Sequence, residues 1–428
     1  MIFQKTLTYH KLYQRYTSLL NLQGCVLLRS HPESRGRFDI FSALPISEHQ
    51  ALDCDDWMMQ WPLKASSAPW PFVGGVIGWV SYEAGLEWHG LAQASQKLIQ
   101  HLPPLHLRYY PGAIVVDHHE QSAHLVWHDA ASPFWQKQLL EAWYSPHTNP
   151  VLKRIEPCFK PLIDKNDYLA TIGRIQQYIQ DGRVYQVNYT QAFSAELEDH
   201  PWHWYWQTQA QNPVHYSGYW AGDNYQLMSF SPECFVQIEQ QTALSQPIKG
   251  TISRGDTPAQ DQQHQIWLEQ SEKNRAENVM IVDLLRNDFG KHAIPGTVTV
   301  PFYCQRQTYK NVHHLVSEVR CQIPQHIHPW TFLKSCIPGG SITGAPKHEA
   351  MKVITELEPY QRQAYCGNLF YLSRHGQVDS NIMIRTASCQ QQQLIIAAGG
   401  GIVIDSNAEE EYQECLAKIK TIAKHLAV

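Results

Sequence analysis

Lys249 lies in a short segment whose residue types restrict the backbone. The segment PIKGTISRG spans residues 247–255, with Pro247 two positions before the lysine and Gly250 directly after it. Proline fixes its own φ angle and glycine adopts conformations that other residues avoid, so the amine is pointed in one direction. Sixteen residues before Lys249, Glu233 directly follows a proline in the segment SFSPECF. A carboxyl and an amine that meet in one pocket can act as acid and nucleophile, or form a simple ion pair.

A glycine-rich loop, SCIPGGSITGAPK at residues 335–347, combines several groups that bind anions. Its glycines expose backbone N–H groups, Ser341 and Thr343 add hydroxyl donors, and Lys347 adds a positive charge just before a predicted helix. The spacing differs from GxxxxGK[ST], so a nucleotide phosphate is not the first interpretation. A tight structural turn is the alternative.

Two carboxylates near the end of the chain suit a hard cation. Glu411, Glu414 and Lys418 are spaced to share one face of a helix. The preceding AAGGGIVIDS brings Gly400 and Gly401 to the end of an apolar strand, where a ligand could approach the backbone closely. Mg²⁺ prefers such oxygen ligands. A solvated charged face is the competing interpretation.

Three further charged or polar residues lie among apolar neighbours. Glu277, in RAENVMIVDLLRND, needs a partner if buried, either a metal or a salt bridge to Arg275 or Arg286. His314 and Arg385 lie in apolar, strand-like segments. Each could be a satisfied core residue, but the fork of an arginine matches a carboxylate.

The elements that must position these residues alternate without a βαβ rhythm. We expect α+β with large antiparallel sheets. The periodicity predicts strands over 24–30, 74–82, 112–118 and 184–193, and helices over 168–179, 271–291 and 409–426. A proline-rich stretch at 144–162 suggests a boundary between an N-terminal region, 1–150, and a catalytic domain, 155–428.

Composition excludes several classes of protein. The net charge is −5 and charged residues make up 17%, so we expect no nucleic-acid partner. The sequence contains no apolar run of the roughly 18 residues that a membrane span needs and no signal-peptide core, so we expect no membrane partner. Ten cysteines without a CxxC pair are typical of buried thiols in a reducing cytoplasm.

Seven ordered motifs resemble one family, the chorismate-binding enzymes. They are PIKGT, RAENVMIVDLLRND, HLVS, PGGSITGAPK, EPYQRQAYCGNLFYL, MIRT and AGGGIVIDSNAEEEYQECLAKI, and they span roughly residues 160–428. LLRS, GRFDIFSALP and GGVIGWVSYEAG extend the match more weakly into the first part. The resemblance implies antiparallel sheets packed as a sandwich, with helices outside.

The resemblance also implies chorismate as substrate and Mg²⁺ as cofactor. By motif position, the metal ligands are Glu277 and Glu414, with Glu411 acting through water. Residues that bind the substrate carboxylates are Tyr365, Arg385, Gly400, Gly401 and Lys418; Ser341 and Thr343 contribute from the loop, and His314 lies beside the ring. Glu233 matches the general acid for the C4 hydroxyl, and Ser30 matches a tryptophan site that is inhibitory in some relatives and that we expect to be a structural relic here.

Two positions distinguish the branches of the family. Isochorismate and salicylate synthases carry a lysine where this chain has Gln186, and anthranilate synthases typically carry alanine where it has Lys249. The combination resembles aminodeoxychorismate synthase component I, in which the uncharged lysine amine attacks C2 before ammonia enters at C4. The rivals are anthranilate synthase component I and a non-catalytic chorismate- or tryptophan-binding subunit.

Other features concern the ammonia source and two departures from the family pattern. None of the ten cysteines lies in a GxCxG-like nucleophile elbow, so we expect ammonia from solution or from a separate glutamine amidotransferase subunit. Asn274 stands where relatives usually carry a carboxylate, which could weaken Mg²⁺ binding, and Phe370 stands where they usually carry glycine.

Overall fold

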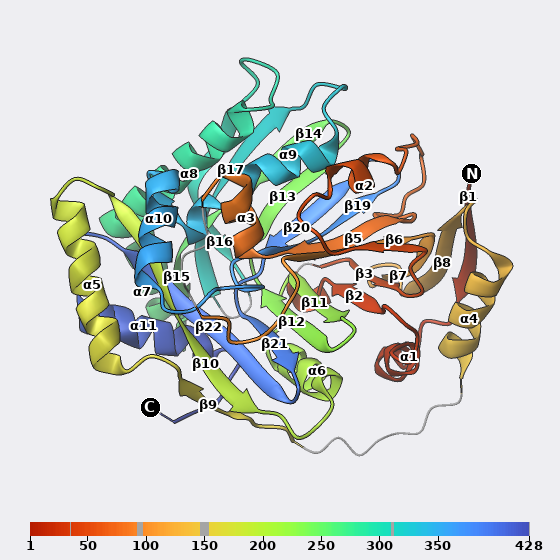
Figure 1. The fold of residues 1–428 in the computed structure, drawn as a ribbon, viewed down its shortest axis with the longest axis horizontal. Coiled ribbons are helices and arrows are strands. Elements are labelled where there is room, and N and C mark those ends of the chain that lie inside the picture. Colours follow the sequence, from red (N-terminus) through yellow and green to blue (C-terminus); the bar gives the residue numbers. More distant parts are fainter. Residues whose placement is uncertain (35, 92–96, 146–153, 310–311, 428) are drawn as a thin grey trace.

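The computed structural model describes residues 1–34, 36–91, 97–145, 154–309 and 312–427. Within these ranges the chain forms two large β-sheets with helices around them (Figure 1). Apart from the parallel pair formed by the last strand, the strand pairs are antiparallel. The α+β class with large antiparallel sheets is therefore confirmed.

The first sheet joins strands from both ends of the chain. In sheet order it contains β1 (Ile2–Leu7), β8 (Ser122–His128), β7 (Gly112–Asp117), β3 (Phe38–Ser42), β2 (Val26–Arg29), β11 (Tyr216–Ala221), β12 (Tyr225–Ser231), β21 (Thr386–Gln390), β22 (Gln393–Ile402), β10 (Gln186–Glu196), β9 (Cys158–Pro161) and β23 (His425–Leu426). A short strand, β18 (Gly344–Ala345), pairs with β10 on the edge opposite β22.

The second sheet carries the lysine segment at one edge. In sheet order it contains β15 (Ile248–Ser253), β17 (Val312–Gln322), β14 (Thr242–Ser245), β13 (Cys234–Glu239), β20 (Val378–Ile382), β19 (Asn368–Ser373), β5 (Gly75–Val80), β6 (Leu105–Tyr110) and β4 (Ser47–His49). A further strand, β16 (Thr299–Thr308), pairs with β17.

The helices surround the sheets. They are α1 (Leu12–Leu19), α2 (Asp55–Met59), α3 (Tyr82–Trp88), α4 (Pro133–Tyr144), α5 (Lys165–Gln180), α6 (Pro201–Gln211), α7 (Pro258–Gln270), α8 (Glu272–Gly290), α9 (Pro329–Cys336), α10 (Lys347–Leu357) and α11 (Ala408–Lys420), with 3₁₀ turns at Pro32–Ser34 and Gly340–Ile342. Figure 1 shows α5, α10 and α11 on the left beside the long strands β10 and β22, and α1 and α4 on the right. None of the helices in the described ranges is long and apolar enough to cross a membrane.

Both sheets cross the expected boundary near residue 150. Strand β2 pairs with β11, and β5 pairs with β19, so the early strands are hydrogen-bonded into sheets completed by later ones. Residues 146–153 of the expected boundary segment lie outside the described residues. Strand β5 is buried along its whole length, which explains why GGVIGWVSY reads as a nearly continuous apolar run.

Two sequence-based expectations about elements are wrong in detail. The last helix was expected to continue to residue 426, but α11 ends at Lys420 and the chain turns to pair β23 with β9. Tertiary pairing here overrides helical periodicity. Arg385 was expected inside a strand, yet it lies in a bend between β20 and β21 with a positive φ of 50°.

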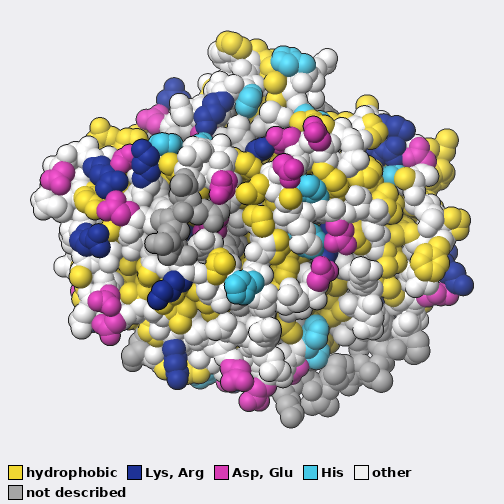
Figure 2. Space-filling model, in the orientation of Figure 1, with side chains coloured by type: hydrophobic (Ala, Val, Ile, Leu, Met, Phe, Trp, Pro, Cys, Tyr) yellow, Lys and Arg dark blue, Asp and Glu magenta, His cyan; other side chains and the backbone are white. Residues whose placement is uncertain are grey.

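The cysteines are all free thiols, and all except Cys158 are buried. The expectation of buried thiols is therefore wrong for Cys158, which is exposed on the short strand β9. Charge is dispersed over the face drawn in Figure 2, where acidic, basic and hydrophobic side chains are interspersed.

Candidate active site

Lys249 lies in a β-bulge of strand β15. Ile248 pairs with Val316 of β17, whereas Thr251 pairs with His314, so β15 carries one extra residue between these pairs. Gly250, next to the lysine, has a φ of 84°. A bulge bends the strand and changes the direction of the side chain at that point. The sequence-based expectation that glycine orients this lysine thus has a structural basis.

Helix α8 approaches Gly250 so closely that little room is left for a side chain at this position. A Cβ atom at Gly250 would lie 3.0 Å from Cγ of Asn274. Asn274 is the residue that departs from the family pattern, and its side chain packs against the lysine bulge. The bulge is therefore confined by both its own backbone and the helix that carries Glu277.

Lys249 and Glu233 are brought together beside the glycine-rich loop. The Lys249 ammonium donates a hydrogen bond to the carbonyl oxygen of Ser341 over 3.3 Å. Glu233 is 7% exposed, and burial raises the pKa of its carboxyl, although the charge of Lys249 and the Ser341 hydroxyl act in the opposite direction. A carboxyl with a raised pKa keeps its proton to higher pH, as a general acid requires.

The glycine-rich loop is fixed to the first sheet. Gly344 of β18 pairs with Val187 of β10, and a Cβ atom at Gly344 would lie only 2.1 Å from the carbonyl oxygen of Gln186. Arg362 donates hydrogen bonds to the carbonyls of Ile342 (2.8 Å) and Asn188 (2.6 Å). The loop is thus held from two sides while its Ser341 carbonyl faces Lys249.

Arg362 is a functional residue that sequence reasoning missed. It is buried, and it forms an ion pair with Glu358 four residues earlier, over 2.6 Å. Its position within EPYQR, four residues after a glutamate, was the available signal. Because a buried arginine without its carboxylate would be costly, this pair stabilises the loop only as a unit.

The anion-binding interpretation of Lys347 is wrong. Its ammonium pairs with the buried Asp288 over 2.5 Å and donates to the carbonyl of Pro338 over 2.8 Å. Thr343, predicted to contact substrate, is fully buried and donates its hydroxyl to the Gly339 carbonyl over 2.9 Å. Both side chains shape the loop from within, and Ser341 is the loop residue that faces the lysine.

The predicted acidic cluster forms at the start of helix α11. Glu411 is 4% exposed and accepts a hydrogen bond from the Ser406 hydroxyl over 2.8 Å. Lys273 of α8 lies 3.5 Å from the same carboxylate, and Lys418 pairs with Glu414 over 2.8 Å. Lys273 was also missed, although it lies one helical turn before Glu277 in the same motif.

Gly400 and Gly401 make room for these side chains. A Cβ atom at Gly400 would lie 2.9 Å from a carboxylate oxygen of Glu411, and the Lys418 ammonium donates to the carbonyl of Gly399 over 2.7 Å. A Cβ atom at Gly401 would lie 2.1 Å from the side-chain nitrogen of Gln186. The space at the two glycines is occupied by the side chains of Glu411 and Gln186, and the expected approach of a ligand to this backbone stays a prediction.

Three glutamates and three lysines share one electrostatic environment. Burial raises the pKa of Glu277, opposed by Lys249 and Lys273. For Glu414, burial also acts to raise the pKa, but Lys418, Lys273 and Lys249 together outweigh it and the pKa is lowered. Of the alternative salt-bridge partners considered for Glu277, Arg286 pairs instead with Asp283 over 2.8 Å.

A resident metal would have to share this cluster with the lysines. In the described part of the chain, no group of three or more His, Cys, Asp or Glu side chains is already arranged to hold a metal ion. The donor set still fits Mg²⁺, because it consists of carboxylate oxygens and Gly400 leaves the space beside Glu411 free of a side chain. The magnesium assignment therefore stays a prediction.

His314 and Arg385 lie close enough to affect each other. His314 is 9% exposed, and its Nδ1 lies 2.7 Å from the Thr251 hydroxyl of β15. Burial and then the charge of Arg385 lower the pKa of His314 to about 4, so its imidazole is neutral at pH 7. Tyr365 lines a small cavity with Thr386, the neighbour of Arg385. His314 is thus linked directly to the strand that carries Lys249.

Ser30 lies in a separate cavity of about 230 Å³. None of the side chains predicted to take part in the reaction lines this cavity. The Ser30 hydroxyl donates to the carbonyl of His215 over 2.7 Å. Two nearby arginines are already paired, Arg29 with Asp39 over 3.3 Å and Arg37 with Asp117 over 2.7 Å.

Comparison with known proteins defines the class. A family model described as chorismate binding enzyme matches residues 35–424. The aminodeoxychorismate synthase component 1 of Klebsiella aerogenes is 39% identical over 358 residues, 83% of this chain and 78% of that protein. That of Escherichia coli (strain K12) is 35% identical over 438 residues, 96% of this chain and 95% of that protein.

Two solved structures have the same fold as this chain. The anthranilate synthase component I of Streptococcus pneumoniae superposes with a TM-score of 0.82 and 28% identity, covering 98% of this chain and 99% of that one. The menaquinone-specific isochorismate synthase of Escherichia coli, at 17% identity and a TM-score of 0.77, shows the same fold over 99% of this chain and 94% of its own. The chain belongs to the chorismate-binding enzymes, and its substrate is chorismate.

Proposed function

We propose that this enzyme aminates chorismate at C4 to give 4-amino-4-deoxychorismate, the precursor of 4-aminobenzoate in folate synthesis. The observation that carries the proposal is Lys249. Its amine lies in a β-bulge, contacts the Ser341 carbonyl and faces the buried Glu233. Two relatives named aminodeoxychorismate synthase component 1 match most of the chain, which supports the same reaction.

The proposed chemistry has two covalent steps. In the first, the uncharged Lys249 amine forms a bond to C2, the ring double bonds shift, and the bond between C4 and its hydroxyl oxygen breaks. Glu233 gives its proton to that oxygen, which leaves as water. In the second, ammonia forms a bond to C4, the double bonds shift back, and the bond between Lys249 and C2 breaks. Splitting the substitution in this way replaces one difficult step by two easier ones.

The remaining residues bind and orient the substrate. Arg385, with its guanidinium largely buried, and Tyr365 are proposed to bind the carboxylates, together with the backbone at Gly400 and Gly401 and the ammonium of Lys418. Neutral His314 is proposed to lie beside the ring. Glu277 and Glu414, with Glu411 through water, would hold Mg²⁺, which would withdraw negative charge from the ring carboxylate.

Ammonia is proposed to come from a separate glutamine amidotransferase subunit. The relatives at 35–39% identity are named component 1, which supports a second component. Cytoplasmic localisation is proposed as well, supported by ten free thiols. We expect the chain alone to use ammonium at alkaline pH and to use glutamine only after the partner is added; release of glutamate from glutamine by the chain alone would contradict this assignment.

Product identification tests the function. The enzyme is incubated with chorismate, Mg²⁺ and ammonium, and the products are separated and identified by mass spectrometry. We expect 4-amino-4-deoxychorismate; anthranilate as the main product would contradict the proposal and indicate anthranilate synthase, and the absence of turnover would indicate a binding subunit.

The variant Lys249→Ala separates the lysine mechanism from simple binding. We expect formation of the C4 product to fall at least about 100-fold and any residual amination to shift towards C2. Chorismate affinity should change little, because its carboxylates contact other residues. A matched control is Lys352→Ala, which removes an exposed lysine of α10 paired with Glu349 and should leave turnover unchanged.

A further inference from the structure

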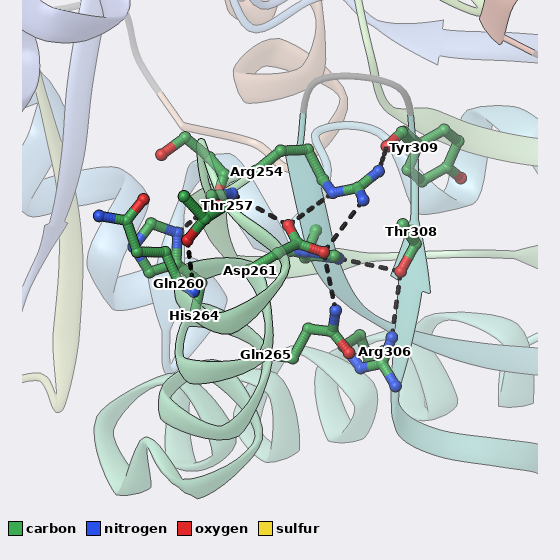
Figure 3. A network of polar contacts seen from close by, with 12 residues as sticks. Arg254, Thr257, Gln260, Asp261, His264, Gln265, Arg306, Thr308 and Tyr309 are labelled. Atoms are coloured by element: carbon green, nitrogen blue, oxygen red, sulfur yellow. Dashed lines mark hydrogen bonds and ion pairs between the residues drawn. The ribbon is translucent and has the colours of Figure 1, made fainter.

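The carboxylate of Asp261 joins three parts of the molecule (Figure 3). Asp261 lies in the first turn of α7 and is 8% exposed. It accepts hydrogen bonds from Arg254 Nε (2.7 Å), Arg254 Nη2 (3.0 Å), the Gly255 backbone N–H (2.9 Å), Gln265 (2.9 Å) and His313 Nε2 (2.9 Å). These donors come from the segment after β15, from α7 and from β17.

The segment after β15 depends on this carboxylate. Strand β15 is the first strand in the sheet order, with β17 as its neighbour, and its ladder is interrupted by the bulge at Lys249. Among the described residues, Thr251–Ser253 continue the pairing with β17 beyond the bulge, as far as Val312. Arg254 and Gly255 then bind Asp261 directly, so the carboxylate fixes the chain where the strand ends.

The packing between this segment and α7 is tight. A Cβ atom at Gly255 would lie 2.2 Å from the backbone nitrogen of Asp261. The guanidinium of Arg254 makes two parallel hydrogen bonds to the carboxylate, a geometry that resists rotation and sliding. The hydrogen bonds from Arg254 and from the Gly255 N–H hold the pKa of Asp261 well below its usual range, so it is ionised at neutral pH.

The same network reaches His314. Arg254 also donates to the carbonyl of Tyr309 over 3.1 Å, and the Tyr309 ring packs edge-on against the His314 ring at 5.4 Å between centroids. His313, bound to Asp261, directly precedes His314 in β17. Both the strand of Lys249 and the imidazole proposed to face the substrate ring are therefore tied to one carboxylate.

We propose that Asp261 is a positioning residue that sets the direction of Lys249 and His314 through Arg254 and His313. This inference rests on the proposed role of Lys249. Asp261 touches neither substrate nor reacting atoms; its effect is on the geometry of attack at C2. A displacement of about 1 Å at a reacting atom can lower a rate about 100-fold without weakening binding.

The test is the variant Asp261→Asn in the full chain, assayed with chorismate, Mg²⁺ and ammonium. We expect kcat for the C4 product to fall about 10- to 100-fold, with KM for chorismate within about 2-fold of wild type. Formation of the Lys249 adduct without ammonia should slow by the same factor as kcat. A purely structural role would instead reduce the folded fraction and leave the kcat of the folded enzyme unchanged.

A second variant and a control keep the outcome clear if Asp261→Asn folds poorly. Arg254→Lys retains the charge at a partly exposed position but loses the paired hydrogen bonds, and it should reduce kcat in the same direction. Gln262→Ala is the matched control, because Gln262 is an exposed residue of the same helix, next to Asp261, and takes no part in the described contacts of the Asp261 carboxylate. Its kcat should equal that of wild type.

Two results would overturn the inference. One is a folded Asp261→Asn or Arg254→Lys enzyme with kcat and adduct formation within about 2-fold of wild type; the other is an equal loss in Gln262→Ala. If wild type forms no adduct on Lys249, or Lys249→Ala retains C4 amination, the proposed role of Lys249 fails, which is a distinct result because it does not involve Asp261; anthranilate as the main product of wild type would instead contradict the proposed function.

Discussion

Two regions of this enzyme pair charged side chains in different ways. In the region around Lys249, the carboxylates and ammonium groups come from β15, α8 and α11, and several share the same partners. In the cavity at Ser30, each nearby arginine has its own aspartate, Arg29 with Asp39 and Arg37 with Asp117. In the first region the charges of several carboxylates and ammonium groups act on one another. In the second, the two arginines are paired with aspartates, and Asp379, whose pKa burial raises to about 7, adds a further carboxyl to the lining.

This difference indicates that an anionic ligand can bind more favourably around Lys249 than in the Ser30 cavity. The Lys249 ammonium donates to the carbonyl oxygen of Ser341, so a dianionic substrate can recruit it by displacing a neutral acceptor. Lys273 and Lys418 already pair with Glu411 and Glu414. An anion entering the Ser30 cavity would have to compete with two existing ion pairs. Changes in the first region should therefore affect catalysis strongly, and changes in the second should affect it weakly.

The largest effect is expected from the acidic cluster. Glu277→Gln or Glu414→Gln should lower turnover about 1000-fold even at saturating chorismate, because each removes one hard ligand proposed for Mg²⁺. Steady-state rates across a Mg²⁺ titration measure this. Glu409→Gln is the control, since Glu409 lies on the same helix in an exposed pair with Lys165. Near-normal turnover in either cluster variant would show that the ligand assignment is wrong.

The next effect concerns pH and His314. Its folded-state pKa, lowered to about 4, lies below the unfolded value near 6.5, so as pH falls through this window the unfolded chain binds a proton that the folded chain does not. The contribution of His314 to the free energy of unfolding should therefore be fully present above about pH 6.5 and decrease by up to about 3 kcal/mol as the pH falls towards 4.

The variant His314→Gln should remove that contribution and flatten the pH dependence. The free energy of unfolding, measured by urea titration at several pH values, compares the two proteins. Parallel pH profiles for wild type and variant would contradict a neutral, buried His314.

A smaller effect is expected at Gly400. The variant Gly400→Ala places a Cβ atom 2.9 Å from the Glu411 carboxylate, which must move, and turnover should fall about 10-fold. Gly173→Ala is the contrast, because this exposed helical glycine has open space around it and alanine should raise stability by about 0.5–1 kcal/mol with unchanged turnover. Kinetics and thermal unfolding measure both. Equal behaviour of the two variants would refute the role of close packing.

The smallest effect is expected at the second cavity. Ser30→Ala removes one hydrogen bond, to the carbonyl of His215, and should change turnover less than 2-fold, with a stability loss of about 1 kcal/mol. Rates with and without added tryptophan test this. A large loss of turnover would show that the two regions are coupled.

Much of the local organisation was predictable from the sequence. The helices near residues 168–179 and 271–291 form as α5 and α8, because apolar spacing and the nearby Gly182 and Gly290 are local signals. The direction of Lys249 was indicated by Gly250, since a positive φ is a property of one residue. Features that depend on a few neighbouring residues could therefore be predicted from the sequence.

Long-range partners were not predictable. Lys347 was expected to bind an anion because its own loop suggested it, but it pairs with Asp288, 59 residues earlier. Asp261 showed no motif, and its importance arises from His313, 52 residues later. The helix expected to reach residue 426 ends early because β9 offers a strand partner. Such contacts join residues that are far apart in the chain, and no periodic pattern in the sequence indicates them.

The central claim is that Lys249 is a covalent nucleophile, and a trapping experiment tests it most directly. The enzyme is mixed with chorismate and Mg²⁺ in the absence of ammonia, digested, and analysed by peptide mass spectrometry. The account predicts a mass increase equal to chorismate less one water on the peptide that contains Lys249, and no such increase in Lys249→Ala. An adduct on another residue, or its absence from an enzyme that makes the C4 product when ammonium is supplied, would contradict the claim.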